Sequence, residues 1–225
     1  MEKAASEIAA MLGLDVIKVD LAQREGRFGA LIEMWEESRS QTARQILEDE
    51  VPRYDSQSDY TYQQVRAVMA PLGLLPDLHD MLVFDALIDN QDRHDQNWEV
   101  RPEGRLMPLF DNCTCSVPLL SIPKQRKLVG NRKRRASLYG NVRSALRWQG
   151  KHCSYDMTPL RLLREIQGQH PDDVAPSLRR VLATPLADMQ SIYDEIPFPA
   201  IDEACRQLAK EALADRYDAF GELVA

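Results

Sequence analysis

The residues that could do chemistry gather in one stretch of the chain, residues 82–112, which reads LVFDALIDNQDRHDQNWEVRPEGRLMPLFDN. An apolar run there is followed by a cluster of polar side chains, namely Asp89, Asn90, Asp92, Arg93, His94, Asp95 and Asn97. Asp111 closes the stretch. A carboxylate can accept a proton, and carboxylate and amide oxygens are ligands that suit Mg²⁺. The stretch therefore has the groups for metal-assisted acid–base chemistry.

The spacing of three of these residues points to phosphoryl transfer. Asp92 precedes Asn97 by five positions, and a predicted hairpin brings Asp111 back beside Asn97. Phosphoryl transfer needs an acceptor for the hydroxyl proton and oxygens that hold Mg²⁺ against the triphosphate. In protein kinases a catalytic Asp is followed five positions later by a metal-binding Asn, and a second metal-binding Asp follows a short hairpin. The alternative is that Asp92, Asn97 and Asp111 only bind nearby backbone groups in turns and caps, as Asp and Asn commonly do.

The two motifs together resemble those of the HipA-type kinases, which are bacterial toxin serine/threonine kinases with features of phosphoinositide 3- and 4-kinases. The family signature L-I-G-N-x-D-R-H-x-x-N is matched by LIDNQDRHDQN, and its P-L-Y-D segment is matched by PLFD. The resemblance implies that Asp92 is the catalytic base and that His94 orients the loop. It also implies that Asn97 and Asp111 hold Mg²⁺ on ATP.

Two further segments resemble the family more weakly. Residues 29–35, GALIEMW, look like the strand that leads to the interlobe hinge, where the backbone near Glu33, Met34 and Trp35 would meet adenine. The first helix looks like the lobe helix that carries an ion-pairing glutamate, for which Glu7 or Glu2 is the candidate.

The chain also departs from the family pattern. It has neither a glycine-rich phosphate loop nor a strand lysine before its first helix, and Cys113 stands where the family tends to have glycine. These departures keep three functions open. The first is ATP- and Mg²⁺-dependent phosphorylation of a protein Ser/Thr hydroxyl. The second is a catalytically weak or inactive binding module, completed by a partner that supplies the phosphate loop and lysine. The third is a lipid kinase.

Local patterns predict an α+β fold. Residues 2–12 have small and aliphatic side chains at helical spacing and end at Gly13. Residues 15–23 and 29–35 predict a strand pair, and residues 77–89 predict a helix with a broad aliphatic face.

Helices are expected over most of the remaining chain, with one embedded hairpin whose turn is RPEG, residues 101–104. The predicted helices are 41–50, 61–72, 158–168, 174–183, 185–194 and 200–223. The resemblance arranges these elements as a protein-kinase-like fold. Its reduced N-lobe and hinge would be residues 1–38, and its helical C-lobe would be residues 39–225.

The charge is distributed unevenly. The formal net charge is −7, yet residues 112–155 contain ten lysines and arginines and no acidic residue. We expect residues 124–151 to form an exposed, mobile segment that binds a phosphate-bearing or acidic partner. The acidic remainder argues against a protein that coats nucleic acid over its whole surface.

Composition excludes several classes of protein. Hydrophobic residues are 44% and charged residues 28% of the 225 residues, as in ordinary globular domains. No apolar run is long enough for a membrane span, and the N-terminus does not look like a signal peptide. Four cysteines without CxxC pairs favour reduced thiols. We therefore expect a cytoplasmic protein whose partners are a protein substrate or a regulatory protein.

Overall fold

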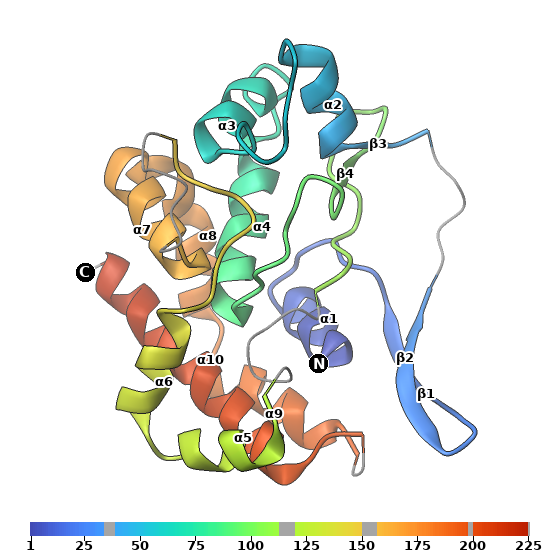
Figure 1. Ribbon diagram of the computed structural model, residues 1–225, viewed down its shortest axis with the longest axis vertical. Helices are drawn as coiled ribbons and strands as arrows, with labels where there is room; N and C mark the ends of the chain where they lie inside the picture. The colour runs from blue at the N-terminus through green and yellow to red at the C-terminus, as the bar shows by residue number, and fades with distance from the viewer. Residues whose placement is uncertain (34–38, 113–119, 150–156, 198–199, 225) are drawn as a thin grey trace.

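The computed structural model describes the chain except for residues 34–38, 113–119, 150–156, 198–199 and 225. The described part contains ten α-helices and two two-stranded antiparallel sheets (Figure 1). The predicted α+β class is confirmed. Met34, Trp35 and Cys113 lie outside the described residues.

The N-terminal part is one helix followed by one hairpin. Helix α1 spans Glu2–Met11 and ends before Gly13, whose φ of +72° suits glycine. Strands β1 (Val19–Arg24) and β2 (Arg27–Ile32) pair antiparallel, as predicted. The two residues between them, Glu25 and Gly26, both have positive φ. Two-residue turns of this kind match the right-handed twist of the strands that they join. The hairpin stands out from the helical body (Figure 1).

Helix α4 (Leu75–Ile88) is the central element of the helical body. Pro76 lies in its first turn, where proline costs no hydrogen bond, and side chains around its whole circumference are buried. It packs against α7 (Pro159–Gln169), α8 (Pro171–Ala183) and α10 (Glu203–Val224). The helix ends at Asp89, which is left-handed with φ 61°. The chain therefore leaves α4 in a fixed direction.

A short sheet holds the loop that follows α4. Strand β4 (Glu99–Val100) pairs antiparallel with β3 (Gln41–Thr42), just before α2 (Ala43–Glu50). Beyond β4 the chain turns through residues 101–105 and returns beside it, since the amide of Met107 donates to the carbonyl of Glu99 at 2.8 Å. The predicted hairpin is confirmed, whereas the sequence did not indicate its pairing with β3.

The predicted C-terminal helices are also present. Thr158 caps α7 by accepting a hydrogen bond from the amide of Arg161 at 3.1 Å. Helix α8 begins at Pro171, earlier than expected, and α9 (Leu186–Glu195) joins it to α10. Helix α3 (Tyr62–Met69) completes the set that surrounds α4. Among the described residues, no helix combines the length and apolarity that crossing a membrane requires.

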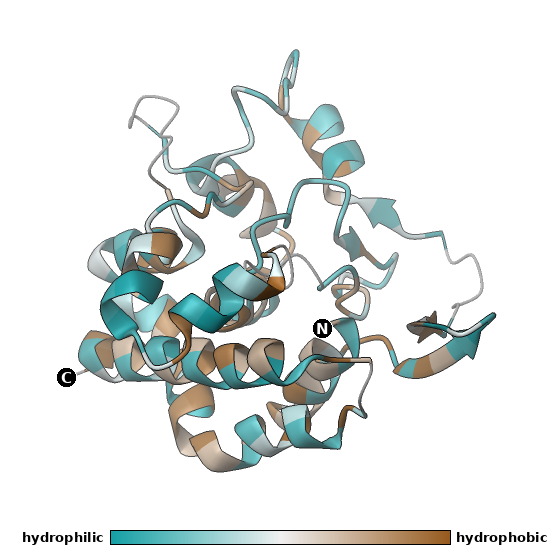
Figure 2. Cartoon of the chain, turned by 60° about the horizontal axis from the view of Figure 1, so that its bottom comes forward, coloured by the Kyte–Doolittle hydropathy of each residue, from teal (hydrophilic) through white to brown (hydrophobic). Residues whose placement is uncertain are grey.

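Most lysines and arginines of the basic segment are exposed, as predicted, while its mobility stays a prediction. Two helices, α5 (Ile122–Leu128) and α6 (Arg132–Tyr139), form there and lie against α10. Figure 2 shows them largely in the hydrophilic colour. Arg135 of α6 is 5% exposed and forms ion pairs with Glu211 and Asp215 of α10. Carboxylates of α10 therefore offset the desolvation of this arginine.

Candidate active site

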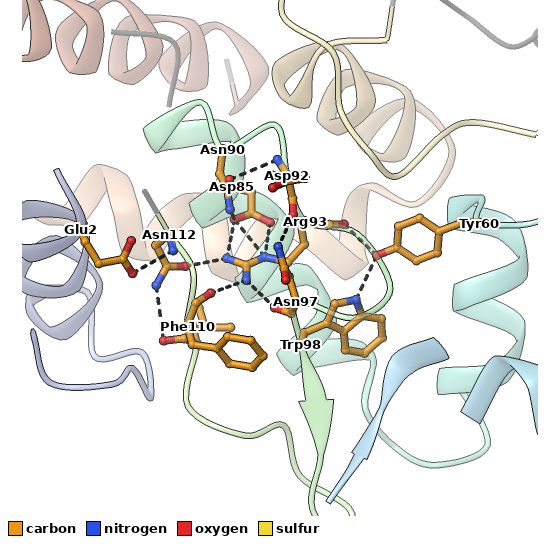
Figure 3. Close-up of polar contacts among 11 residues, drawn as sticks. Glu2, Tyr60, Asp85, Asn90, Asp92, Arg93, Asn97, Trp98, Phe110 and Asn112 are labelled. Carbon is orange, nitrogen blue, oxygen red and sulfur yellow. Dashed lines mark hydrogen bonds and ion pairs between the residues drawn. The ribbon is translucent and has the colours of Figure 1, made fainter. Parts of the chain in front are cut away.

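Arg93 lies at the centre of the loop that connects α4 to β4 (Figure 3). Its guanidinium is 2% exposed and binds four groups from three parts of the chain. Nη2 lies 2.9 Å from Oδ1 of Asp85 in α4, and it donates to Oδ1 of Asn112 at 2.6 Å. Nη1 donates to the carbonyls of Asn97 and Phe110, each at 2.8 Å. One side chain thus joins the helix, the loop and the returning segment.

Asp85 explains how a guanidinium can be buried at this position. Burial alone would lower the pKa of Arg93, but the nearby Asp85 carboxylate more than compensates and holds that pKa above its ordinary value. Asp85 also accepts a hydrogen bond from Nδ2 of Asn90 at 3.0 Å. The ion pair and these hydrogen bonds satisfy both partners, which a buried pair requires.

Asp92 and Asn97 face each other across the loop. Nδ2 of Asn97 donates to the carbonyl of Asp92 at 2.7 Å, and the Asp92 amide donates to Oδ1 of Asn90 at 3.3 Å. Asn97 is 7% exposed, whereas Asp92 is half-buried. Because the amide nitrogen of Asn97 is committed to the loop, its oxygen is the atom available to a cation.

Asp111 lies between two anchored neighbours. The carbonyl of Phe110 accepts from Arg93, and the amide of Asn112 donates to Oε1 of Glu2 at 2.9 Å. Asp111 itself is half-buried with φ 51°, a conformation that is uncommon for a residue other than glycine. These two hydrogen bonds hold the backbone on both sides of Asp111, so the position from which its side chain extends is fixed near the Arg93 guanidinium.

His94 has a local hydrogen bond in the structure. Its Nδ1 accepts from the amide of Gln96 at 3.1 Å, within the turn that leads to Asn97. Two aromatic side chains support the same turn from the opposite side. Tyr60 donates its hydroxyl to the Arg93 carbonyl at 2.9 Å, and Nε1 of Trp98 donates to that hydroxyl at 2.9 Å. The loop is therefore braced by buried groups around it.

The donor set fits Mg²⁺ bound together with a nucleotide. Within the described ranges, no three His, Cys, Asp or Glu side chains are grouped so that they could hold a metal ion. Asn97 and Asp111 offer two oxygen donors, and both adjoin groups that hydrogen-bond to Arg93. Mg²⁺ in kinase sites takes its remaining ligands from phosphate oxygens and water.

The other residues implied by the resemblance are placed as follows. Glu33 is exposed, and its amide extends the hairpin by donating to the carbonyl of Lys18 at 3.1 Å. Met34 and Trp35 cannot be placed, because they lie outside the described residues. Glu2 is buried against the Asn112 amide. Glu7 is exposed and pairs with Lys3 on the same helix. Of the two glutamates, Glu2 is the one that contacts the segment around Asp111.

Sequence reasoning did not assign the roles of Arg93 and Asp85. The signal was a single acidic residue within an otherwise apolar helical run, LVFDALI, with an arginine eight positions later. An acid at a buried helical position needs a partner, and a nearby arginine can be one.

Neither a protein-family model nor a curated protein matches this sequence. Solved structures do match it. The Helicobacter pylori proinflammatory kinase CtkA is similar with a TM-score of 0.83 and 20% identity, over 99% of this chain and 82% of that chain. The chain has a kinase fold.

A second solved structure extends the comparison. The HipA toxin–antitoxin system of Shewanella oneidensis MR-1, solved with HipB and operator DNA, is similar with a TM-score of 0.61 and 16% identity. The match covers 98% of this chain and 55% of that chain. The resemblance to HipA-type kinases is thereby confirmed at the level of the fold. This kinase-like fold has a reduced N-lobe.

Proposed function

We propose that this chain transfers the γ-phosphoryl group of ATP to a Ser/Thr hydroxyl of a protein, with Mg²⁺. The observation that carries the proposal is the hydrogen-bonded set around Arg93. It ties the loop of Asp92 and Asn97 to the segment of Asp111. Phosphoryl transfer depends mainly on positioning and electrostatics, so a rigid loop with these three side chains fits that reaction.

Each residue has a distinct role in the proposed mechanism. Asp92 accepts or orients the proton of the attacking hydroxyl, and its half-buried position leaves it within reach of an acceptor. Asn97 and Asp111 hold Mg²⁺, which would neutralise charge on the phosphates when bound. Arg93 and His94 orient the loop through their hydrogen bonds to the backbone.

The proposal assigns two lobes to the chain. Residues 1–38 form the reduced N-lobe and hinge, and residues 39–225 form the C-lobe. The adenine of ATP would meet the backbone near Glu33, Met34 and Trp35. A protein substrate or regulatory partner is part of this proposal, in keeping with the HipA structure, which was solved together with HipB.

Calorimetry of ATP binding with and without Mg²⁺, followed by transfer of labelled phosphate to a protein extract, tests this function. We expect Asn97→Ala and Asp111→Ala to weaken Mg²⁺-dependent binding. Asp92→Asn should keep binding but lose transfer by about 10²–10⁴-fold, which is typical for loss of a positioned base. Asp49→Asn is the matched control, because Asp49 is exposed on α2. Parental transfer by Asp92→Asn would refute the mechanism.

A second candidate is a nucleotide-binding regulatory module without transferase activity. The observation in its favour is that Lys3 is engaged by Glu7 and Asp20 rather than directed at the loop of Asp92. The same experiment separates the two functions. Mg²⁺-dependent binding of ATP without transfer to any protein would favour the module.

A further inference from the structure

A cavity of about 610 Å³ lies apart from the candidate active site, among helices α6, α7 and α10. Its volume is in the range of small-molecule sites, about 300–1,000 Å³. Asp89, the residue at which α4 ends, lines it, whereas Asp92, Asn97 and Asp111 do not. The cavity therefore offers a place for a second ligand.

Arg216 of α10 lines this cavity and is 3% exposed. Its Nη2 contacts Oδ1 of Asp89 at 2.7 Å, and its guanidinium lies 3.7 Å from the centroid of the Tyr139 ring. Its Nε is buried and has no hydrogen-bond partner in the part of the chain that the structure describes. Buried donors are nearly always paired, so this N–H calls for an acceptor that the described residues do not supply.

Three more arginines line the same cavity: Arg132 on α6, which also pairs with Asp215 and Asp218, and Arg161 and Arg164 on α7. Arg161 and Arg164 are three positions apart and so lie on neighbouring parts of the helix surface. Guanidinium groups match phosphate oxygens with paired N–H donors, and they bind phosphate better than isolated lysines do.

Two acidic groups of the lining are engaged by arginines. Asp89 pairs with Arg216 of the lining, and Asp215 pairs with Arg132 of the lining at 3.4 Å and with Arg135 at 2.7 Å. Asp215 also accepts from the hydroxyl of Tyr139 at 3.2 Å. Glu165 and Glu222 complete the acidic lining. The apolar part of the wall consists of Ala136, Leu160 and Ala219.

We propose that this cavity binds a small phosphomonoester, with the phosphoryl group on the arginines and the remainder of the ligand against the apolar wall. The site is separate from the proposed ATP site. The carboxylate of Asp89 and a bound phosphoryl group would compete for Arg216. Because Asp89 begins the loop that carries Asp92, occupancy of the cavity would alter that loop, and this last consequence rests on the proposed function.

Calorimetry on the full chain without Mg²⁺ tests the site, with AMP, O-phosphoserine and inorganic phosphate as separate probes. We expect at least one probe to bind, and Arg164→Gln to weaken it about tenfold or more. Arg179→Gln is the control, because Arg179 is exposed on α8 and does not line the cavity. Preference for AMP would indicate a nucleotide ligand, and preference for O-phosphoserine a phosphorylated amino acid. Failure of all three probes, or equal losses in both variants, would overturn the proposal.

Repeating the titration with Asp111→Ala separates this site from the proposed active site. We expect probe binding to survive, since Asp111 does not line the cavity. Loss of binding in Asp111→Ala would mean that the probe occupies the candidate active site, and the cavity proposal would fail. If the parent chain binds the probe but shows no phosphoryl transfer, the proposed function is refuted and the cavity site stands.

Discussion

At the scale of single residues, two buried acid–arginine pairs hold the candidate loop and the end of α4 that precedes it. Asp85 with Arg93 and Asp89 with Arg216 are each nearly inaccessible to solvent. The family motif has glycine where this chain has Asp89, and the left-handed φ of 61° explains why glycine suits that position. The pair with Arg216 offsets the backbone cost of an aspartate there.

We predict that Arg93→Met lowers the free energy of unfolding by about 3–5 kcal/mol, since it leaves the Asp85 carboxylate buried and unpaired. Urea denaturation followed by circular dichroism measures this change. Arg24→Met is the control, because the Arg24 side chain is 93% exposed. The double variant Asp85→Leu/Arg93→Met should recover part of the loss. If Arg93→Met is as stable as the control Arg24→Met, the buried pair contributes little to stability.

His79 predicts a dependence of stability on pH. Burial lowers the pKa of His79 from 6.5 to about 4, and the hydroxyl of Tyr62 lies 2.8 Å from its Nε2. Between pH 6.5 and 4 the unfolded chain therefore binds a proton that the folded chain does not. The free energy of unfolding falls as pH drops through this window, by about 3 kcal/mol in total from this group.

The measurement is urea denaturation at pH 7.5 and pH 4.5 for the parent chain and for His79→Gln. The variant has no imidazole to protonate, so its stability should fall less between the two pH values. The difference between the two slopes isolates His79 from the carboxylates that also titrate. A variant with the same loss as the parent would show that His79 is not shielded from water.

At the scale of elements, α5 and α6 are held against the body both by apolar packing, for example of Leu128 and Tyr139, and by ion pairs with α10. Arg135 and Arg132 reach the carboxylates of α10, while Lys124, Lys127 and Lys133 on the same helices are exposed. Helices this short are marginal without tertiary contacts. Their helical state therefore depends on α10.

We predict that Arg135→Gln speeds hydrogen exchange of the α6 amides about tenfold or more, because charge-assisted hydrogen bonds contribute about 1.5–3 kcal/mol. Exchange detected by mass spectrometry gives the rates. Lys133→Gln removes an exposed charge from the same helix and should change little. If α6 exchanges at the parental rate in Arg135→Gln, its packing does not rest on this ion pair.

At the scale of the whole molecule, a cationic pair of helices lies on an acidic body, since the net charge is −7 despite ten cations in residues 112–155. Salt shortens the screening length from about 10 Å at 0.1 M to about 3 Å at 1 M. Exposed pairs such as Arg132 with Asp218 weaken most, because buried pairs are screened less.

We therefore predict that 1 M NaCl raises hydrogen exchange in α5 and α6 a few-fold and leaves α4 unchanged. Helix α4 is held by apolar side chains that are buried around it, and salt does not weaken those contacts. The same mass-spectrometric measurement at 0.1 M and 1 M NaCl provides the comparison. Uniform acceleration in both regions would indicate that salt destabilises the whole fold rather than this interface.

Local sequence patterns were sufficient for much of the fold. The end of α1 near Gly13, the cap of α7 at Thr158 and the apolar run of α4 each depend on residues within a few positions of one another. The motif LIDNQDRHDQN likewise identified the candidate loop, because residue types and spacing are properties of the chain itself.

Tertiary structure decided how those residues are held. The contacts of Glu2 with Asn112 and of Arg135 with Asp215 join positions 110 and 80 residues apart, so no local pattern could reveal them. The basic segment shows the physical reason. Its like charges predict exposure, which most of its lysines and arginines show, whereas its two helices form because carboxylates of α10 lie against Arg132 and Arg135.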